Sequence, residues 1–122
     1  MSVRVVLCED HAALREIVRE TCVAAGHDVV GETASADEAA TLAARWAAQV
    51  VVLDLSSGAT PDDTIRPVAE RAPAAAIVAY TGLACADLGG DARRSLAAHV
   101  AKTAPLTELL AEIERAAGAG QV

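Results

Sequence analysis

Short apolar runs alternate with amphipathic stretches along the whole chain. The apolar runs are rich in Val, which is typical of buried strands, and they predict five strands, at residues 3–8, 27–32, 50–53, 75–80 and 98–101. Helical spacing and cap signals predict five helices, at about 14–25, from a cap at 35 to about 48, from a cap at 60 to about 71, at 91–97, and from about 104–105 onwards. Strands that alternate with helices favour right-handed crossovers and a parallel sheet that is covered on both faces. The pattern therefore predicts a doubly wound (βα)5 α/β fold.

The ends and faces of these helices can be predicted from single residues. In the first helix, Leu14, Ile17, Val18, Cys22 and Ala25 recur at the spacing of one apolar face, and Gly26 is a C-terminal stop. Ser35 followed by Glu38 is a capping box at the start of the second helix, whose inner face is expected to carry Leu42 and Trp46. The chain has 122 residues, which suits a single domain. We predict one domain over 1–117, with 118–122 as a tail or the start of a linker.

Composition narrows the functional classes. Aromatic residues make up 2% of the chain and the formal net charge is −7, so both base stacking and attraction to a nucleic-acid backbone are disfavoured. No apolar run approaches the roughly 20 residues of a membrane span, and no signal peptide is evident. Three widely spaced cysteines form neither a disulfide framework nor a CxxC pair. We expect a cytoplasmic protein that binds neither nucleic acid nor membrane directly.

Polar side chains follow four of the five predicted strands. Glu9 and Asp10 follow the first strand, Asp54 the third, Thr81 the fourth and Lys102 the fifth. In a doubly wound sheet the ligand crevice lies beyond the carboxyl ends of the strands. These side chains are therefore expected to meet at one edge of the sheet.

Three carboxylates at one edge need a compensating positive charge. Like charges about 4 Å apart repel by roughly 4 kcal/mol at an effective dielectric constant near 20. Lys102 supplies one positive charge, and a pocket of oxygen ligands also suits a hard cation, most simply Mg²⁺. An Asp54 carboxylate held between Lys102 and Mg²⁺ could attack a phosphoryl group and carry it as an acyl phosphate, to which Thr81 could hydrogen-bond.

These residues resemble the receiver domains of two-component response regulators, and the resemblance extends over nearly the whole chain. The matching segments are Leu-Cys-Glu-Asp-His at 7–11, Val-Val-Leu-Asp-Leu at 51–55, Ala-Tyr-Thr-Gly at 79–82 and His-Val-Ala-Lys at 99–102. The resemblance implies the flavodoxin-like strand order 2-1-3-4-5. It also implies a domain that catalyses only its own phosphotransfer and dephosphorylation and is otherwise a signalling module.

The resemblance implies a role for each site residue. Asp54 would accept phosphate from a sensor histidine kinase or a phosphotransfer protein. Asp10 would bind Mg²⁺ directly and Glu9 through water, and Asp54 and the main-chain carbonyl of Ser56 would complete the protein ligands. Lys102 would pair with the acceptor carboxylate and later with the phosphate.

The same resemblance implies a switch. Thr81 would be the switch hydroxyl, moving toward the phosphate and pulling its loop along to change a protein-interaction surface. That surface could also mediate a homodimer.

Three departures from the family pattern lie in the signalling half of the mechanism. Ser57-Gly58 stand where the family often has Met-Pro, and Thr103 stands where Pro usually follows the Lys. His99 replaces the aromatic residue that usually forms the second part of the switch, and it could gate the surface instead.

Two other functions compete with phosphoacceptor signalling. A degenerate receiver would keep the fold as a binding or dimerisation module that is independent of phosphorylation. A Mg²⁺-dependent phosphohydrolase of the haloacid-dehalogenase type would need a second Asp two residues after the nucleophile, where this chain has Ser56.

Overall fold

The computed structural model describes residues 2–56, 60–83 and 87–119. The strands are Arg4–Cys8 (β1), Asp28–Thr33 (β2), Val50–Leu53 (β3), Ala76–Thr81 (β4) and Ala98–Ala101 (β5). The helices are Ala12–Ala24 (α1), Ala36–Arg45 (α2), Pro61–Arg71 (α3), Gly90–Ser95 (α4) and Leu106–Ala119 (α5). Each predicted strand and helix is therefore present, with ends that differ from the prediction by a few residues at most.

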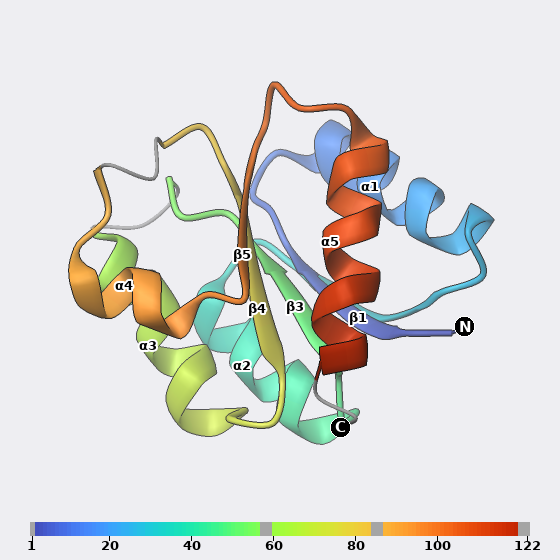
Figure 1. Cartoon of the computed structure of the whole chain (residues 1–122). Coiled ribbons are helices and arrows are strands. Elements are labelled where there is room, and N and C mark those ends of the chain that lie inside the picture. Colours follow the sequence, from blue (N-terminus) through green and yellow to red (C-terminus); the bar gives the residue numbers. More distant parts are fainter. Residues whose placement is uncertain (1, 57–59, 84–86, 120–122) are drawn as a thin grey trace.

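The strands form one parallel sheet in the order β2-β1-β3-β4-β5, which confirms the predicted fold class and strand order (Figure 1). The order reverses at β1, because the chain builds outward to β2 and then returns to β3 on the other side. This reversal is where a doubly wound sheet opens a crevice beyond its strand ends. The sheet is regular except for a register shift between Val5 and Val6, where β1 pairs with β2.

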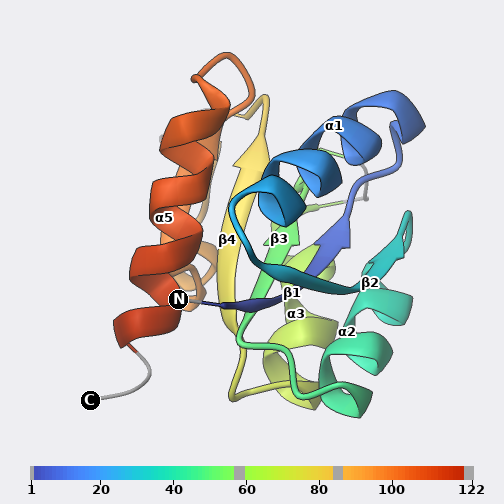
Figure 2. The same ribbon diagram turned by 90° about the vertical axis from the view of Figure 1, so that its right-hand side faces the viewer.

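Two helical layers bury the two faces of the sheet (Figures 1 and 2). On one face, α1 and α5 pack against a cluster that includes Val5, Leu7 and Val52. On the other face, α2, α3 and α4 pack against the alternate strand residues, among them Val6 and Leu53. Because successive strand side chains point to opposite faces, a strand buried on both faces must be apolar throughout. The uninterrupted run in β3 therefore reflects its central place in the sheet.

The first helix ends as its glycine predicts. Gly26 has φ of +90°, and its N–H donates to the carbonyl of Val23 while the N–H of His27 donates to that of Cys22. This pair of bonds is the Schellman motif, in which a left-handed residue ends the helix and satisfies its last carbonyls. Glycine suits this position because it has no Cβ to clash.

The second helix ends earlier than predicted, at Arg45, and it uses an alanine for the same geometry. Ala47 has φ of +52°, and the N–H of Ala48 donates to the carbonyl of Ala43 at 3.0 Å. Alanine gives no sequence signal for a left-handed residue, so the prediction carried the helix on to residue 48. The left-handed conformation costs an alanine free energy because of its Cβ, and the bond from Nε of Arg4 to the Ala47 carbonyl at 2.8 Å is a tertiary contact that offsets this cost.

Two apolar residues that were predicted to face the core do not. Trp46 caps α2 and is 49% exposed, with the guanidinium of Arg45 stacked 5.2 Å from its ring. Ile17 in α1 is 47% exposed. Both residues continue the apolar repeat of their helix, but they lie outside the part of the helix that packs against the sheet.

Cys8 and Cys22 are free thiols and are buried, which agrees with a structural role for both. Burial, followed by the charge of Asp54, raises the pKa of Cys8 to about 12. Burial raises the pKa of Cys22 to about 11. Both thiols are therefore protonated at neutral pH and chemically inert there. The third cysteine, Cys85, lies outside the described residues.

Within the described ranges, no helix is both long enough and apolar enough to cross a membrane. Helix α5 continues to Ala119, past the predicted domain boundary at residue 117. The division into a domain at 1–117 and a tail at 118–122 stays a prediction.

Candidate functional site

The sheet itself brings the predicted site residues together at its carboxyl edge. Glu9 and Asp54 directly follow β1 and β3, Thr81 is the last residue of β4, and Lys102 directly follows β5. Backbone bonds continue the sheet pairing to these positions: the N–H of Asp54 donates to the carbonyl of Cys8, and that of Lys102 donates to the carbonyl of Thr81. Parallel pairing therefore fixes the backbone position of each of these residues.

Lys102 lies between two buried carboxylates. Its Nζ is 2.9 Å from Oδ2 of Asp54 and 2.8 Å from Oε2 of Glu9. The side chains of Asp54 and Glu9 are only 3% and 7% exposed, whereas that of Lys102 is 25% exposed. One partly exposed ammonium group thus compensates two charges that are almost wholly removed from water.

Ser56 holds the other oxygen of Asp54. Its backbone N–H donates to Oδ1 at 2.9 Å and its hydroxyl donates to the same oxygen at 2.6 Å. An aspartate that accepts bonds from the residue two positions later is the local arrangement that Asp favours at turns. The carboxylate is consequently oriented by its own loop on one side and by Lys102 on the other.

Glu9 is oriented from the start of α1. The N–H of His11 donates to Oε1 at 3.1 Å, and Arg15 donates from Nη1 to the main-chain carbonyl of Glu9 at 2.8 Å. His11 also caps α1, with its side chain accepting from the N–H of Leu14. The second carboxylate oxygen, Oε2, is buried and has the charge of Lys102 beside it, but the approach lacks the alignment of a hydrogen bond.

The two carboxyl groups are driven in opposite directions by this environment. Burial raises the pKa of Glu9 above its ordinary value, with the neighbouring charge of Asp54 adding to the rise against the opposing effects of Lys102 and His11. For Asp54, burial also acts to raise the pKa, but the bonds from Ser56 and the pairing with Lys102 outweigh it, so its pKa is lowered. Burial acts to lower the pKa of Lys102, and its pairing with Glu9 and Asp54 outweighs that effect and raises it. At neutral pH, Asp54 is an ionised carboxylate beside an ammonium group.

The acidic cluster fits a hard divalent cation. Glu9, Asp10 and Asp54 each offer an oxygen, and these oxygens lie within 4.8 Å of one another. Asp10 is exposed and faces a groove of about 500 Å³ that Asp54, Ser56 and Lys102 also line. Carboxylate oxygens without sulfur ligands suit Mg²⁺ or Ca²⁺, and the buried Glu9 oxygen that lacks a hydrogen bond leaves an acceptor for a metal-bound water.

Thr81 and His99 meet on a residue that the sequence did not single out. Thr81 is buried, and its Oγ1 accepts from the N–H of Leu83 at 3.3 Å. Nε2 of His99 lies 2.9 Å from the carbonyl oxygen of Leu83, so the ring donates to it. The structure therefore links Thr81 to His99 through the peptide units on the two sides of Leu83. Among the described residues, no hydrogen bond or ion pair joins His99 to the acidic cluster.

Sequence reasoning also missed two supporting interactions. The bond from the Ser56 hydroxyl to Asp54 and the bond from Arg15 to the Glu9 carbonyl were not predicted. A serine two residues after an aspartate is a usable signal for the first, whereas the reach of Arg15 depends on where α1 docks. Ser57 and Gly58, which stand where the family often has Met-Pro, lie outside the described residues.

No protein-family model matches this sequence, and none of the curated proteins matches it either. Many solved structures do match. A LuxR-family two-component response regulator from Aurantimonas sp. SI85-9A1 is 26% identical, with a TM-score of 0.84 over 98% of this chain and 87% of the other. The REC domain of AraT, a response regulator from Geobacillus stearothermophilus, is 23% identical, with a TM-score of 0.78 over 97% and 95%. A CheY-like receiver domain protein from Methanospirillum hungatei JF-1 is 14% identical, with a TM-score of 0.82 over 99% and 98%.

These structures agree in the class of protein that they define. The five-stranded sheet, its strand order and the coverage of nearly the whole chain are those of a receiver domain. This chain accordingly has the receiver-domain fold and is similar to the response regulators named above, as the resemblance in its sequence predicted.

Proposed function

We propose that this receiver domain accepts a phosphoryl group on Asp54, in a reaction that requires Mg²⁺, and that the phosphoryl group changes a protein-interaction surface. The observation that carries the proposal is the position of Lys102, which pairs with the ionised Asp54 carboxylate at 2.9 Å while a second carboxylate, Glu9, lies beside it. The groove leaves these groups accessible from solvent. A purely structural ion pair would not need an open groove or a second buried acid.

The chemistry follows from the charges at the site. One oxygen of Asp54 attacks the phosphorus of a phosphohistidine, the new P–O bond forms as the P–N bond breaks, and the bonding pair stays on the imidazole nitrogen, which takes up a proton. Both Asp54 oxygens accept hydrogen bonds, so the attacking oxygen must exchange one of them. Lys102 is the partner that is free to follow, because its charge can move from the carboxylate to the phosphoryl oxygens.

Asp10 and Asp54 would hold Mg²⁺ directly, Glu9 would hold it through water, and the main-chain carbonyl of Ser56 would complete the protein ligands. Mg²⁺ would neutralise charge on the transferred phosphoryl group. The residues of this chain supply the rest: Ser56 orients the acceptor, Glu9 keeps Lys102 at the acceptor, and His11 and Arg15 fix Glu9.

The proposed switch runs from Thr81 through Leu83 to His99. When the Thr81 hydroxyl turns to the phosphate, it gives up the N–H of Leu83, and of these two bonds to Leu83 only the one from His99 to its carbonyl is left. His99 would thus take the place of the usual aromatic residue as a hydrogen-bonded latch. His99→Phe removes the donor and restores the family's aromatic type, and we expect the amide of Leu83 to exchange faster with solvent in the unphosphorylated state. Exchange at Leu83 that is unchanged in this variant would contradict the latch.

The central test is the formation of an acyl phosphate. The protein is treated with acetyl phosphate and Mg²⁺, and intact mass spectrometry is used to look for the mass of one added phosphoryl group that hydroxylamine removes. We expect the adduct in the wild-type chain and in Asp37→Asn, an exposed acid on α2, and no adduct in Asp54→Asn. Chelation of Mg²⁺ should suppress the reaction.

The same experiment separates the two competing functions. The absence of an adduct in the wild-type chain, or an adduct that still forms in Asp54→Asn, would contradict the proposal. Either result would favour a binding or dimerisation module that does not use phosphate. Sustained release of phosphate from phosphomonoesters would favour a phosphohydrolase instead. At the position where that chemistry needs a second Asp, Ser56 donates its hydroxyl to Asp54.

The partners follow from the proposed reaction. The phosphodonor would be a sensor histidine kinase or a phosphotransfer protein in the cytoplasm, and the reader of the switched surface would be another protein or a second copy of this chain. Some similar structures belong to proteins described as DNA-binding response regulators, such as one from Staphylococcus aureus. The output of the signal would depend on the protein that reads this surface.

A further inference from the structure

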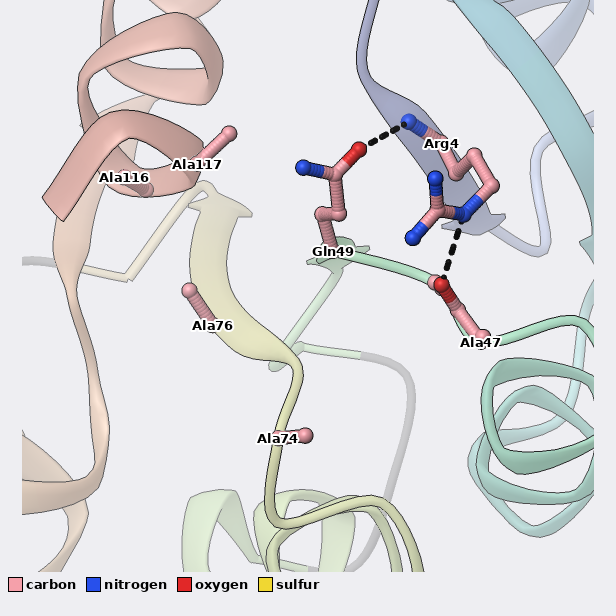
Figure 3. A pocket seen from close by; sticks show the side chains of 8 residues that line it. Arg4, Ala47, Gln49, Ala74, Ala76, Ala116 and Ala117 are labelled. Atoms are coloured by element: carbon pink, nitrogen blue, oxygen red, sulfur yellow. Dashed lines mark hydrogen bonds between the residues drawn. The ribbon is translucent and has the colours of Figure 1, made fainter. Parts of the chain in front are cut away.

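A second cavity lies at the opposite edge of the sheet from Asp54. It has a volume of about 220 Å³ and is lined by residues at the amino ends of β1, β3 and β4 and by α5 (Figure 3). The lining residues are Arg4, Ala47, Ala48, Gln49, Ala74, Ala76, Ala116 and Ala117. Nothing in the proposed phosphoryl transfer uses this cavity, because parallel strands separate it from the carboxyl edge by their full length.

The Arg4 guanidinium is held at this cavity by one side only. Its Nε donates to the carbonyl of Ala47 at 2.8 Å, and the left-handed conformation of Ala47 is part of the turn that presents this carbonyl. Figure 3 shows the two Nη atoms on the side of the guanidinium that faces Gln49. Among the described residues, no carboxylate lies within 4.0 Å of Arg4, whereas seven other Lys or Arg side chains have such a partner.

Gln49 adds a second donor group with a fixed orientation. Its Oε1 accepts the backbone N–H of Arg4 at 3.0 Å, which requires the amide nitrogen to be the other atom of the group. That nitrogen points away from Arg4 toward the α5 side of the cavity (Figure 3), and it has no hydrogen-bond partner among the described residues. The polar side of the cavity thus offers N–H donors from two side chains and no carboxylate.

The remaining walls are methyl groups. All six of the other lining residues are alanines, and those on β4 and α5, Ala76, Ala116 and Ala117, are buried or partly buried. Small side chains leave room between the strand ends and α5. A ligand for this cavity must therefore present an acceptor with negative charge at one end and an apolar group at the other.

We propose that this cavity binds a small aliphatic or aromatic monocarboxylate, with its carboxylate on Arg4 and Gln49 and its hydrocarbon part against the alanines. Guanidinium groups bind carboxylates through paired N–H donors, and such charge-assisted bonds are among the strongest in proteins. An apolar cavity of roughly 150 Å³ accommodates benzene, so this volume admits butyrate or benzoate. The proposal does not depend on phosphorylation of Asp54.

The test is a titration of the full chain with butyrate at neutral pH, followed by amide and side-chain NMR shifts. Saturable shifts are expected at Arg4 and at the Gln49 side-chain amide, with a dissociation constant on the order of 1 mM, as befits a ligand of few atoms. The chain has one tryptophan, Trp46, which is next to Ala47, so its fluorescence gives a second signal. Butylamine and 1-butanol have the same number of carbon atoms as butyrate and should not saturate the site.

Two variants test the site without removing the fold, one at a donor group and one at the wall of the cavity. Gln49→Glu keeps the oxygen that accepts the Arg4 N–H but puts a negative charge at the mouth, and we expect it to weaken butyrate binding by at least about tenfold. Ala74→Leu fills the cavity from an exposed position and should abolish binding. Equal binding of 1-butanol, or butyrate binding that is unchanged in both variants, would overturn the proposal. Shifts that rise linearly with butyrate and never saturate would overturn it as well.

Discussion

At the carboxyl edge of the sheet, Lys102 lies between two buried carboxylates, whereas at the amino edge Arg4 has no carboxylate partner among the described residues. The two edges are the opposite ends of the same strands, and at each edge the parallel pairing fixes the backbone positions of the residues. The first edge has more negative than positive charge and suits a cation and a phosphoryl group. The second edge has donors that lack an acceptor and suits an anion.

This difference teaches that the imbalance of charge, more than the presence of charge, identifies a site. Surface ion pairs such as Arg66 with Asp63 are balanced and contribute little to either stability or binding. Glu9 has a raised pKa, and the two Nη groups of Arg4 have no hydrogen-bond partner among the described residues, so each leaves an interaction that a ligand can complete. Substitutions that restore or worsen the balance at either edge therefore test the comparison.

The largest expected effect comes from removing the shared cation. Lys102→Met should lower the free energy of unfolding by about 2 kcal/mol at neutral pH without Mg²⁺, because it leaves Glu9 and Asp54 facing each other in a buried site. Chemical denaturation measures the loss. Adding Glu9→Gln to this variant should restore most of it, since only one charge then remains. Lys102→Met with unchanged stability would mean that the two carboxylates do not repel.

The next effect is stabilisation by Mg²⁺ bound at the carboxyl edge. Mg²⁺ at ten times its dissociation constant should raise the free energy of unfolding by about 1.4 kcal/mol, because it binds the folded chain only. Thermal unfolding with increasing Mg²⁺ measures this. Asp10→Asn should lose most of the stabilisation, whereas Asp37→Asn, on α2, should keep it. Equal stabilisation of both variants would place the ion away from the acidic cluster.

A smaller effect is expected from relieving the excess charge directly. Glu9 has a raised pKa, so its folded form binds a proton more readily than its unfolded form, and the ionised group costs stability at neutral pH. Glu9→Gln should therefore raise the free energy of unfolding without Mg²⁺ by roughly 1 kcal/mol at pH 7.

The sign of its pH dependence follows from the same shift. The gain from Glu9→Gln should shrink as the pH falls through the folded-state pKa of Glu9, where the wild-type carboxyl becomes neutral as well. Asp54 behaves in the opposite way, because its lowered pKa stabilises the fold above the unfolded value and loses this contribution as the pH falls through the folded-state pKa. A gain for Glu9→Gln that grows toward low pH would contradict this assignment.

The smallest effect belongs to the amino edge. Ala47→Gly should raise the free energy of unfolding by about 0.5 kcal/mol, since glycine tolerates the positive φ but loses more backbone entropy on folding. Denaturation curves of the two chains would resolve this difference. Ala47→Val should instead be destabilising, and a valine variant as stable as the wild type would mean that the turn is not strained.

The elements and the residues of the carboxyl edge could be predicted because they depend on local pattern. Val50 to Leu53 had to be a central strand, and the polar residue after each strand had to lie at the same edge, once the alternation of strands and helices was recognised. The predictions went wrong where a helix face or helix end depends on packing. Trp46 lies beyond the last turn of α2, and Ile17 on a side of α1 that the sheet does not cover.

The sequence by itself determined the order of the elements, the five-strand α/β fold and the convergence of Glu9, Asp54, Thr81 and Lys102, because parallel strands carry their ends to a common edge whatever the side chains do next. Only the tertiary structure decided how those side chains pair. The ammonium group of Lys102 lies between two carboxylates, the ring of His99 reaches the carbonyl of Leu83, and Nε of Arg4 reaches the carbonyl of Ala47. Each of these contacts joins residues that are distant in the sequence. Contacts of that kind depend on how the helices dock on the sheet, and the hydrophobic pattern of a single helix does not contain that information.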